Sequence, residues 1–307
     1  MYITNCEAAP QEHGILRYMP REIRRYMYNI DLAGVQEIRM RIDKPLMIKY
    51  PEGYLYLGRR SNLTALPGSA LKVTRTMLDE AVEKAAASSV YSVKDEIKNG
   101  FITVRGGHRI GITGTAVING NRVEFIKDVS GLCYRLAREV IGASDRVIDK
   151  IAAQSGIKNT LIISPPGAGK TTMLRDIARQ LSYKGYSVSI VDERRELAAL
   201  YEGRSAFDLG FNTDVLEGVD KAEGMLMVLR AMSPDVIITD ELGTSGDIAA
   251  IEKITNSGTA VIASIHGNGM DMLSRRKDLE AMLGFFDVVI TLSRRNGVGT
   301  VEELLVK

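Results

Sequence analysis

The segment from Thr160 to Thr172, TLIISPPGAGKTT, contains the residue types of a phosphate-binding site. It begins with apolar and β-branched residues, as in a buried strand, and apolar side chains at helical spacing follow it. A glycine loop between a strand and a helix directs backbone N–H groups at a phosphate. A lysine and a hydroxyl after the loop then serve the β- and γ-phosphates and Mg²⁺. We therefore predict a nucleotide-binding loop made by Pro166, Gly167, Ala168, Gly169, Lys170, Thr171 and Thr172.

The loop departs from the pattern G-x-x-x-x-G-K-[ST] at one position, because Ser164 stands where the first glycine is expected. A serine can make this turn as long as its φ is not strongly positive, and Pro165 and Pro166 stiffen the backbone. The structural alternative is a plain glycine turn before an ordinary helix. The strand and helix patterns on either side favour the phosphate loop.

Three further apolar runs end in polar side chains that could complete such a site. The run 234–241 ends in Asp240 and Glu241, and a P-loop fold sets a strand of this kind beside the strand of the loop. We expect Asp240 to hold Mg²⁺ through water, together with the Thr171 hydroxyl, and Glu241 to orient or polarise the attacking water. A helix N-cap is the structural alternative for this Asp–Glu pair.

The second run ends in Asp192 and Glu193, and the third in Ser264 and His266. The acid pair could position water or metal, or form only a charged turn. Ser264 or His266 could hydrogen-bond a γ-phosphate, although a single histidine at a strand end is more often structural. The predicted catalytic residues are Glu241, Glu193, Asp192 and His266.

The elements around these motifs divide the chain near residue 140. The first part mixes helical and alternating patterns, with hairpin turns at Gly106-Gly107-His108 and Asn119-Gly120-Asn121. Its helical patterns span 11–28 (broken by Pro20) and 76–87, and its strand patterns span 35–42, 46–50, 101–105, 109–113, 115–118 and 122–126. The second part alternates helical stretches with strands near 160–164, 187–192, 235–240, 259–265 and 286–292. We predict a smaller mixed α+β domain at 1–140 and, at 141–307, a P-loop domain with a mostly parallel sheet covered by helices.

Composition and charge restrict the class of protein. The chain has 307 residues, 45% hydrophobic and 25% charged, which is typical of one or two globular domains. We expect no membrane-spanning run and no secretory signal. Cys6, Cys133 and the three histidines lack the spacing of a disulfide framework or a metal site, which fits a reducing cytosol.

The charges are unevenly distributed along the chain. Residues 1–140 hold 21 Lys and Arg against 15 Asp and Glu, and residues 141–307 hold 19 Lys and Arg against 23 Asp and Glu. The basic first part could meet nucleic acid, anionic lipid or an acidic partner, or be a solvated surface.

The order of the four motifs resembles that of the type II and type IV secretion ATPases, with their Walker A, Asp box, Walker B and His box. Further segments extend the likeness to nearly the whole chain, and their combination is similar to the stage III sporulation protein AA family. These segments are QEIRMRIDKPL at 36–46, GFITVRGGHRIG at 100–111, RLAREV at 135–140, SPPG at 164–167, VDER at 191–194 and SRRNG at 293–297.

This resemblance implies a RecA-like core that hydrolyses ATP with Mg²⁺, in a homo-oligomer expected to be a hexamer. It also implies a cytoplasmic protein of the mother cell, peripherally associated with the membrane, that energises a channel to the forespore with membrane proteins as partners. By the same resemblance Lys170 takes the Walker A role, Glu241 the Walker B role, Asp192 and Glu193 the Asp-box role and His266 the His-box role. Secretion ATPases also use arginines, some from a neighbouring subunit; the candidates are Arg105, Arg109, Arg135, Arg138, Arg194 and Arg195.

Other functions fit the same loop. A nucleic-acid-dependent ATPase of the RecA or helicase type would use the basic first part, but interleaved aromatic residues would support that function and the chain has no Trp. A small-molecule kinase needs an acceptor pocket and usually an Arg-rich lid, and no clear lid is present. A GTPase is disfavoured because the chain lacks an Asn-Lys-x-Asp motif. We expect no nucleic-acid partner, and we expect residues 1–140 to dock against a neighbouring subunit's ATPase domain because their charges are complementary.

Overall fold

The computed structural model describes residues 14–32, 34–86, 100–120, 122–153, 156–267, 269 and 282–307. The chain divides into two compact units, Met1–Arg138 and Glu139–Lys307. Cys6, His13 and the beginning of the helical pattern predicted at 11–28 lie outside the described residues. No helix in the described ranges has both the length and the apolar character needed to cross a membrane.

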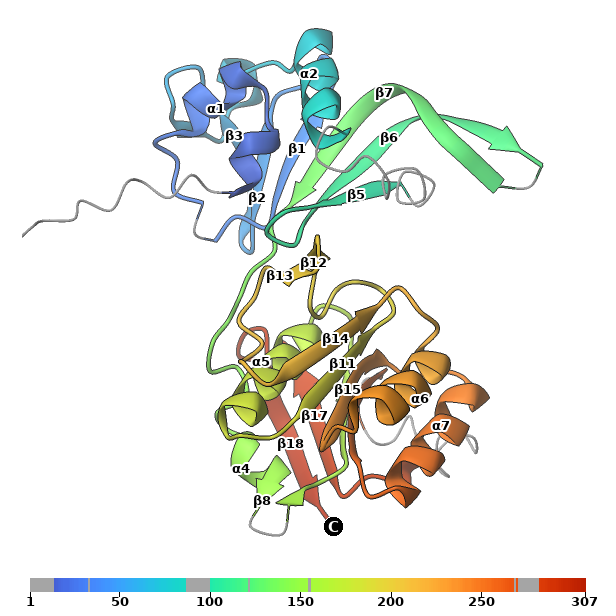
Figure 1. Ribbon diagram of the computed structural model, residues 1–307. Helices are drawn as coiled ribbons and strands as arrows, with labels where there is room; N and C mark the ends of the chain where they lie inside the picture. The colour runs from blue at the N-terminus through green and yellow to red at the C-terminus, as the bar shows by residue number, and fades with distance from the viewer. Residues whose placement is uncertain are drawn as a thin grey trace, which may run out of the picture. The chain divides into compact units, whose positions relative to one another are not determined.

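The N-terminal unit is built on a seven-stranded sheet with the order β4-β3-β2-β1-β7-β6-β5 (Figure 1). All neighbouring strands in it are antiparallel. The strands are β1 (Glu37–Arg41), β2 (Met47–Tyr50), β3 (Gly53–Leu57), β4 (Leu63–Thr64), β5 (Phe101–Val104), β6 (His108–Asn119) and β7 (Arg122–Arg135). The helical elements are the 3₁₀ turns η1 (Gly14–Tyr18) and η2 (Pro67–Ser69) and the helices α1 (Arg21–Met27) and α2 (Arg75–Ala86).

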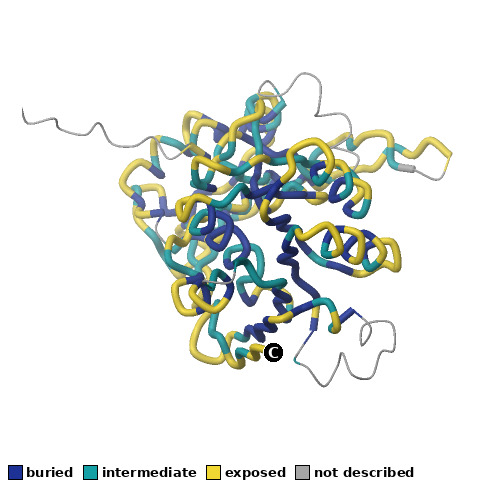
Figure 2. Tube along the Cα trace, turned by 60° about the horizontal axis from the view of Figure 1, so that its bottom comes forward, coloured by how far each residue is buried: buried dark blue, intermediate teal, exposed yellow. Residues whose placement is uncertain are grey.

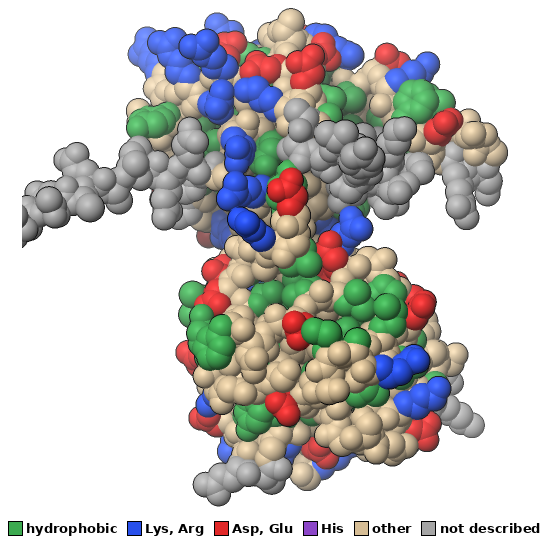
Figure 3. Space-filling model, viewed as in Figure 1, with side chains coloured by type: hydrophobic (Ala, Val, Ile, Leu, Met, Phe, Trp, Pro, Cys, Tyr) green, Lys and Arg blue, Asp and Glu red, His purple; other side chains and the backbone are tan. Residues whose placement is uncertain are grey.

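A single apolar core joins the helices of this unit to its sheet. Leu78 and Ala81 on one face of α2 are buried together with Ile38 and Met40, which alternate along β1. The fully buried Tyr134 of β7 also donates a hydrogen bond from its hydroxyl to the backbone carbonyl of residue 18, at 3.0 Å. On the face drawn in Figure 3, Lys and Arg side chains gather on this unit.

Strands β5 and β6 form the hairpin predicted at Gly106-Gly107-His108, and β6 pairs with β7 from Asn119 and Arg122 onward, while Asn121 of the second predicted turn lies outside the described residues. Strands β6 and β7 are longer than predicted. A register shift at Gly114 lets the predicted strands 109–113 and 115–118 continue as one strand, β6. A Cβ at Gly114 would lie 2.6 Å from the Lys127 carbonyl oxygen of β7, so the close approach of the two strands requires glycine.

The C-terminal unit is built on a second seven-stranded sheet with the order β14-β11-β15-β16-β10-β17-β18. Its strands are parallel except for the hairpin of β17 and β18. The strands are β10 (Thr160–Ser164), β11 (Val188–Asp192), β14 (Thr213–Glu217), β15 (Val236–Glu241), β16 (Ala260–His266), β17 (Val288–Ser293) and β18 (Thr300–Val306). The helices are α4 (Ile148–Ile151), α5 (Lys170–Tyr183), α6 (Lys221–Met232) and α7 (Ser245–Asn256). Two small ribbons pair β8 (Ala152–Ala153) with β9 (Gly156–Ile157), and β12 (Leu200–Tyr201) with β13 (Arg204–Ser205).

Helices cover both faces of this sheet. Alternate strand residues such as Ile162 share one core with Leu174 and Ile177 of α5, whereas their neighbours such as Ile163 share another core with α6 and α7. The central strands are therefore buried on both sides, as their dark tubes show in Figure 2, and their sequences form continuous apolar runs. The predicted fold class, a mixed N-terminal domain followed by a mostly parallel P-loop sheet, is confirmed.

Candidate functional site

The predicted phosphate loop connects β10 to α5. Gly167 and Gly169 have φ values of 68° and 99°, where a side chain would be strained. Ser164 keeps a negative φ, and its hydroxyl donates to the Pro165 carbonyl oxygen at 2.8 Å. This is the condition under which a serine replaces the first glycine of the pattern. The first amides of α5 have no acceptor one helical turn back, so they are available to an anion at the helix N-terminus.

The turn between β17 and β18 donates hydrogen bonds to two carbonyl oxygens of this loop. Arg294 Nε donates to the Gly167 carbonyl oxygen at 3.0 Å, and the Gly299 amide donates to the Ala168 carbonyl oxygen at 3.0 Å. A Cβ at Gly167 would lie 2.0 Å from Arg294 Nη2. Gly167 is favoured by its positive φ, and a side chain there would also displace the guanidinium packed against it.

Lys170 and Glu241 meet at the carboxyl end of the sheet. Lys170 is the first residue of α5 and Glu241 the last residue of β15, and their Nζ and Oε2 atoms are 3.5 Å apart. Arg194, in the loop after β11, also lies 3.5 Å from the same carboxylate oxygen through its Nη1 atom. The lysine that would serve the phosphates and the carboxylate that would serve the attacking water are thus side by side.

A second ionic group lies next to this pair and is centred on Lys221, the first residue of α6. The Lys221 Nζ atom lies 2.9 Å from Asp240 Oδ1 and 3.3 Å from Glu193 Oε2, and it also donates to the Glu241 carbonyl oxygen. The Lys221 side chain is 6% exposed. Burial disfavours its ammonium, but Asp240 and Glu193 outweigh burial and raise the pKa of Lys221. Burial raises the pKa of Asp240, and Lys221 opposes that shift.

Asp192 holds the loop that carries Glu193. Its fully buried carboxylate accepts the amide of Glu196 at 2.8 Å and that of Ala198 at 2.9 Å. Burial raises the pKa of Asp192, partly opposed by these amides. Both carboxylate oxygens are engaged with the loop backbone, so its contacts are those of a positioning residue.

Arg175 of α5 binds the backbone of the same loop. Its guanidinium donates to the carbonyl oxygens of Leu197 and Glu196 at 2.8 and 2.9 Å and lies over the Phe207 ring, 3.5 Å from the centroid. Burial lowers the pKa of Arg175 to about 10. The helix that begins at Lys170 is therefore tied to the loop that presents Glu193.

The third predicted strand end lies beside the phosphate loop. His266, the last residue of β16, is exposed and pairs in parallel register with Ser164, and the Gly267 amide donates to the Ser164 carbonyl oxygen at 3.1 Å. Ser264 is buried and lies in register with Glu241. All four predicted motifs thus end at the same edge of the sheet.

The residues at this edge fit a magnesium nucleotide. The loop supplies glycines, free helix amides and a lysine, which is the chemistry that binds a phosphate chain. In the described ranges no three Asp, Glu, His or Cys side chains gather as metal ligands. Mg²⁺ bound mainly by phosphate and water needs only one or two protein oxygens, and the Thr171 hydroxyl and the Asp240 carboxylate are of that kind.

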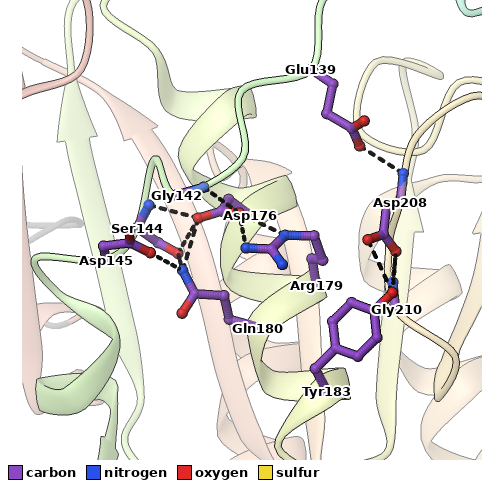
Figure 4. A network of polar contacts seen from close by, with 10 residues as sticks. All are labelled: Glu139, Gly142, Ser144, Asp145, Asp176, Arg179, Gln180, Tyr183, Asp208 and Gly210. Atoms are coloured by element: carbon purple, nitrogen blue, oxygen red, sulfur yellow. Dashed lines mark hydrogen bonds and ion pairs between the residues drawn. The ribbon is translucent and has the colours of Figure 1, made fainter.

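A buried polar network fixes α5 to the chain segment before the domain's first helix (Figure 4). Asp176 accepts the amides of Gly142 and Ser144 at 3.1 and 2.8 Å, and the Ser144 hydroxyl at 2.7 Å. Arg179 and Gln180 also donate to it, at 2.8 and 3.0 Å. Burial alone would raise the pKa of this carboxyl, but the hydrogen bonds dominate and lower the pKa of Asp176 to about 2.

We expect Asp176→Asn to lower the free energy of unfolding by about 2 kcal/mol at pH 7. The ordinary pKa of the group is 3.8 and the folded value is about 2, so its contribution is complete above pH 4 and disappears as the pH falls through 2. Urea unfolding of both proteins between pH 7 and pH 2.5 measures this effect. A stability difference that stays constant over this range would contradict the assignment.

The six candidate arginines lie in different surroundings. Arg194 contacts Glu241, and Arg195 Nε lies 3.6 Å from Glu217 Oε1. The other four candidates belong to the N-terminal unit. Arg135 Nε lies 3.3 Å from Glu37 Oε1, and Arg138 donates to the Val35 carbonyl oxygen. Arg109 packs on the Phe101 ring, and Arg105 is exposed at the β5–β6 turn.

Three side chains around this site were not predicted from the sequence: Lys221, Arg175 and Arg294. Lys221 follows the N-cap residue Asp220, and a lysine in a first helical turn carries no signal of a buried role. The contacts of Arg175 and Arg294 join residues 21 and 127 positions apart, which no local pattern encodes. The only available sign for Arg294 was the SRRNG segment.

Comparisons with known proteins agree with this architecture. The chain is 34% identical over 278 residues to stage III sporulation protein AA of Bacillus subtilis, covering 88% of this chain and 86% of that protein. Its fold is similar to that of the Legionella pneumophila ATPase DotB (TM-score 0.57, 16% identity, 93% of this chain and 78% of that one). It is also similar to the pilus retraction motor PilT with bound ADP (TM-score 0.58, 14% identity, 93% and 82%).

At these identities the two solved structures show the fold alone. The family model described as sporulation stage III, protein AA matches residues 10–306, which is nearly the whole chain. This chain therefore belongs to the stage III sporulation protein AA family.

Proposed function

We propose that the chain binds ATP with Mg²⁺ at residues 166–172 and hydrolyses it, and that hydrolysis energises a channel complex between mother cell and forespore. The observation that carries the proposal is the 3.5 Å approach of Lys170 Nζ to Glu241 Oε2 at the end of a parallel sheet. The ADP bound in the similar PilT structure supports a nucleotide as the ligand. The family match supports the role in sporulation.

In this proposal the loop amides and the N-terminus of α5 bind the β-phosphate, and Lys170 reaches the β- and γ-phosphates. Glu241 orients the attacking water and accepts its proton. Glu193, which pairs with Lys221, assists in placing the water, and His266 hydrogen-bonds the γ-phosphate. Thr171 and Asp240 hold the metal ion. When bound, Mg²⁺ supplies charge neutralisation at the phosphate oxygens.

We also propose that the protein acts in the mother-cell cytoplasm as a homo-oligomer, expected to be a hexamer, bound peripherally to membrane proteins of the channel complex.

A nucleic-acid-dependent ATPase is the second candidate function, favoured by the basic side chains of the N-terminal unit. Phosphate release from ATP, measured with and without single- and double-stranded DNA, separates the two. We expect unchanged turnover with DNA. Stimulation of several-fold that disappears with salt would support the second candidate instead.

We expect an arginine from a neighbouring subunit to complete the site, and Arg105 is the first candidate because it is exposed at the β5–β6 turn. An arginine supplied in trans is worth roughly 10³-fold or more in phosphoryl transfer. Arg105→Ala and Lys170→Ala proteins should each be inactive alone and regain turnover when mixed, because each supplies the part that the other lacks. Turnover should also rise with protein concentration.

The matched control mixes Lys170→Ala with Glu241→Gln protein, two changes within the same nucleotide site. That mixture should stay inactive at every ratio. Full activity of Arg105→Ala alone, or a specific activity independent of concentration for a monomer, would reject the trans arginine.

A further inference from the structure

Lys221 contacts two of the carboxylates of the candidate site, those of Asp240 and Glu193. Its single ammonium touches a carboxylate of β15, a carboxylate of the loop after β11 and the backbone carbonyl of residue 241. The ammonium donates a hydrogen bond to this carbonyl oxygen and forms ion pairs with the two carboxylates. The helix that carries Lys221 is fixed, because Gly224 of α6 packs so closely on Val219 and Val191 that a Cβ would lie 2.7 and 2.8 Å from their side chains.

The buried Asp240 carboxylate requires such a cation. Asp240 is 9% exposed, and the Glu193 side chain, which is 42% exposed, faces the same ammonium, so two negative charges lie within reach of one positive charge. A buried carboxylate with a second carboxylate beside it is unfavourable unless a cation lies between them. Lys221 supplies that cation from within the protein.

A divalent cation that arrived alone would have to compete with this ammonium for the Asp240 carboxylate. One that arrived on nucleotide phosphates would bring its own oxygen ligands and would need the carboxylate only through water. The two cases therefore differ in how much of the ionic contact between Lys221 and Asp240 must be given up.

We propose that Lys221 is a positioning residue that holds Asp240 and Glu193 together and makes divalent-cation binding at this edge depend on nucleotide phosphate. This inference rests on the proposed function for the part that involves nucleotide. Its prediction for the protein without nucleotide stands on the Lys221 contacts alone.

The test is a titration of the full-length protein with Mn²⁺, without nucleotide, followed by electron paramagnetic resonance of the free ion. We expect Lys221→Met and Lys221→Gln to bind Mn²⁺ at least about tenfold more tightly than the parent, because Asp240 and Glu193 lose the ammonium that contacts both. Lys221→Arg keeps the charge and should bind as weakly as the parent. Lys253→Met removes an exposed lysine of α7 and should change nothing.

Lys221→Gln keeps a donor for the carbonyl oxygen of residue 241, so it carries the test if the methionine variant does not fold. A second readout is the melting temperature, which Mn²⁺ should raise more for the glutamine variant than for the parent. Equal Mn²⁺ affinity and equal melting shifts for the parent and Lys221→Gln would overturn the proposal. An inactive parent protein would count against the ATPase function instead, since the titration needs no turnover.

Discussion

Glu241→Gln should bind ATP as well as the parent and release phosphate at least about 10²-fold more slowly, the size of a lost general base. The amide keeps the shape of the side chain but cannot accept a proton from water. It also removes the charge that lies 3.5 Å from both Lys170 and Arg194. We therefore expect nucleotide affinity to be preserved or increased, because Lys170 loses a competitor of the phosphates. Equilibrium binding of a fluorescent ATP analogue, together with single-turnover phosphate release, separates the two effects.

The matched control is Glu193→Gln, which changes the neighbouring carboxylate on the other side of Lys221. It should lower turnover less, because Glu193 contacts Lys221 and lies in the loop after β11. Normal hydrolysis by Glu241→Gln combined with a large loss in Glu193→Gln would move the catalytic role to the β11 loop.

Lys170→Ala should abolish turnover and weaken ATP binding while the fold is kept. The lysine begins α5, and the phosphate-loop pattern assigns its ammonium to the β- and γ-phosphates. Loss of one such electrostatic group costs roughly 10²–10³-fold in rate. The folded core does not depend on it, because its side chain is partly exposed and its ionic partner Glu241 retains Arg194. Circular dichroism and thermal melting check the fold, and phosphate release checks the activity.

The control for this substitution is Lys184→Ala, which removes an exposed lysine just after the end of the same helix. That variant should hydrolyse ATP like the parent. Undiminished turnover by a folded Lys170→Ala protein would contradict the phosphate-loop assignment.

Strand ends were predictable because in this fold each central strand is an apolar run that stops at a polar residue. Asp192, Asp240, Glu241 and His266 could therefore be assigned to one edge of a parallel sheet before any geometry was known. Strands β14 and β18 were missed. They form the two edges of the sheet, and their residues are only partly buried or exposed. Their sequences therefore mix apolar and charged residues and resemble those of loops.

Contacts between distant segments could not be predicted. Lys221 looks like any lysine at a helix start, and only the packing of α6 beside β15 brings it to Asp240. Asp192 was predicted, with Glu193, to position water or metal. The structure adds that its carboxylate accepts amides of its own loop, a contact that depends on how that loop turns back. Local sequence patterns predict which face of a helix or strand is buried. They do not predict which charged groups come into contact after folding.

We propose that the edge formed by residues 166–172 and Glu241 hydrolyses ATP. Phosphate release by the purified full-length protein, with ATP and Mg²⁺ over a range of protein concentrations and with the Glu241→Gln protein purified in parallel, tests it most directly. We predict Mg²⁺-dependent release by the parent that rises with concentration and is lost in the variant. Release at the same rate by both proteins would rule out this site as the place of hydrolysis. So would a folded parent that binds ATP but releases no phosphate at any protein concentration.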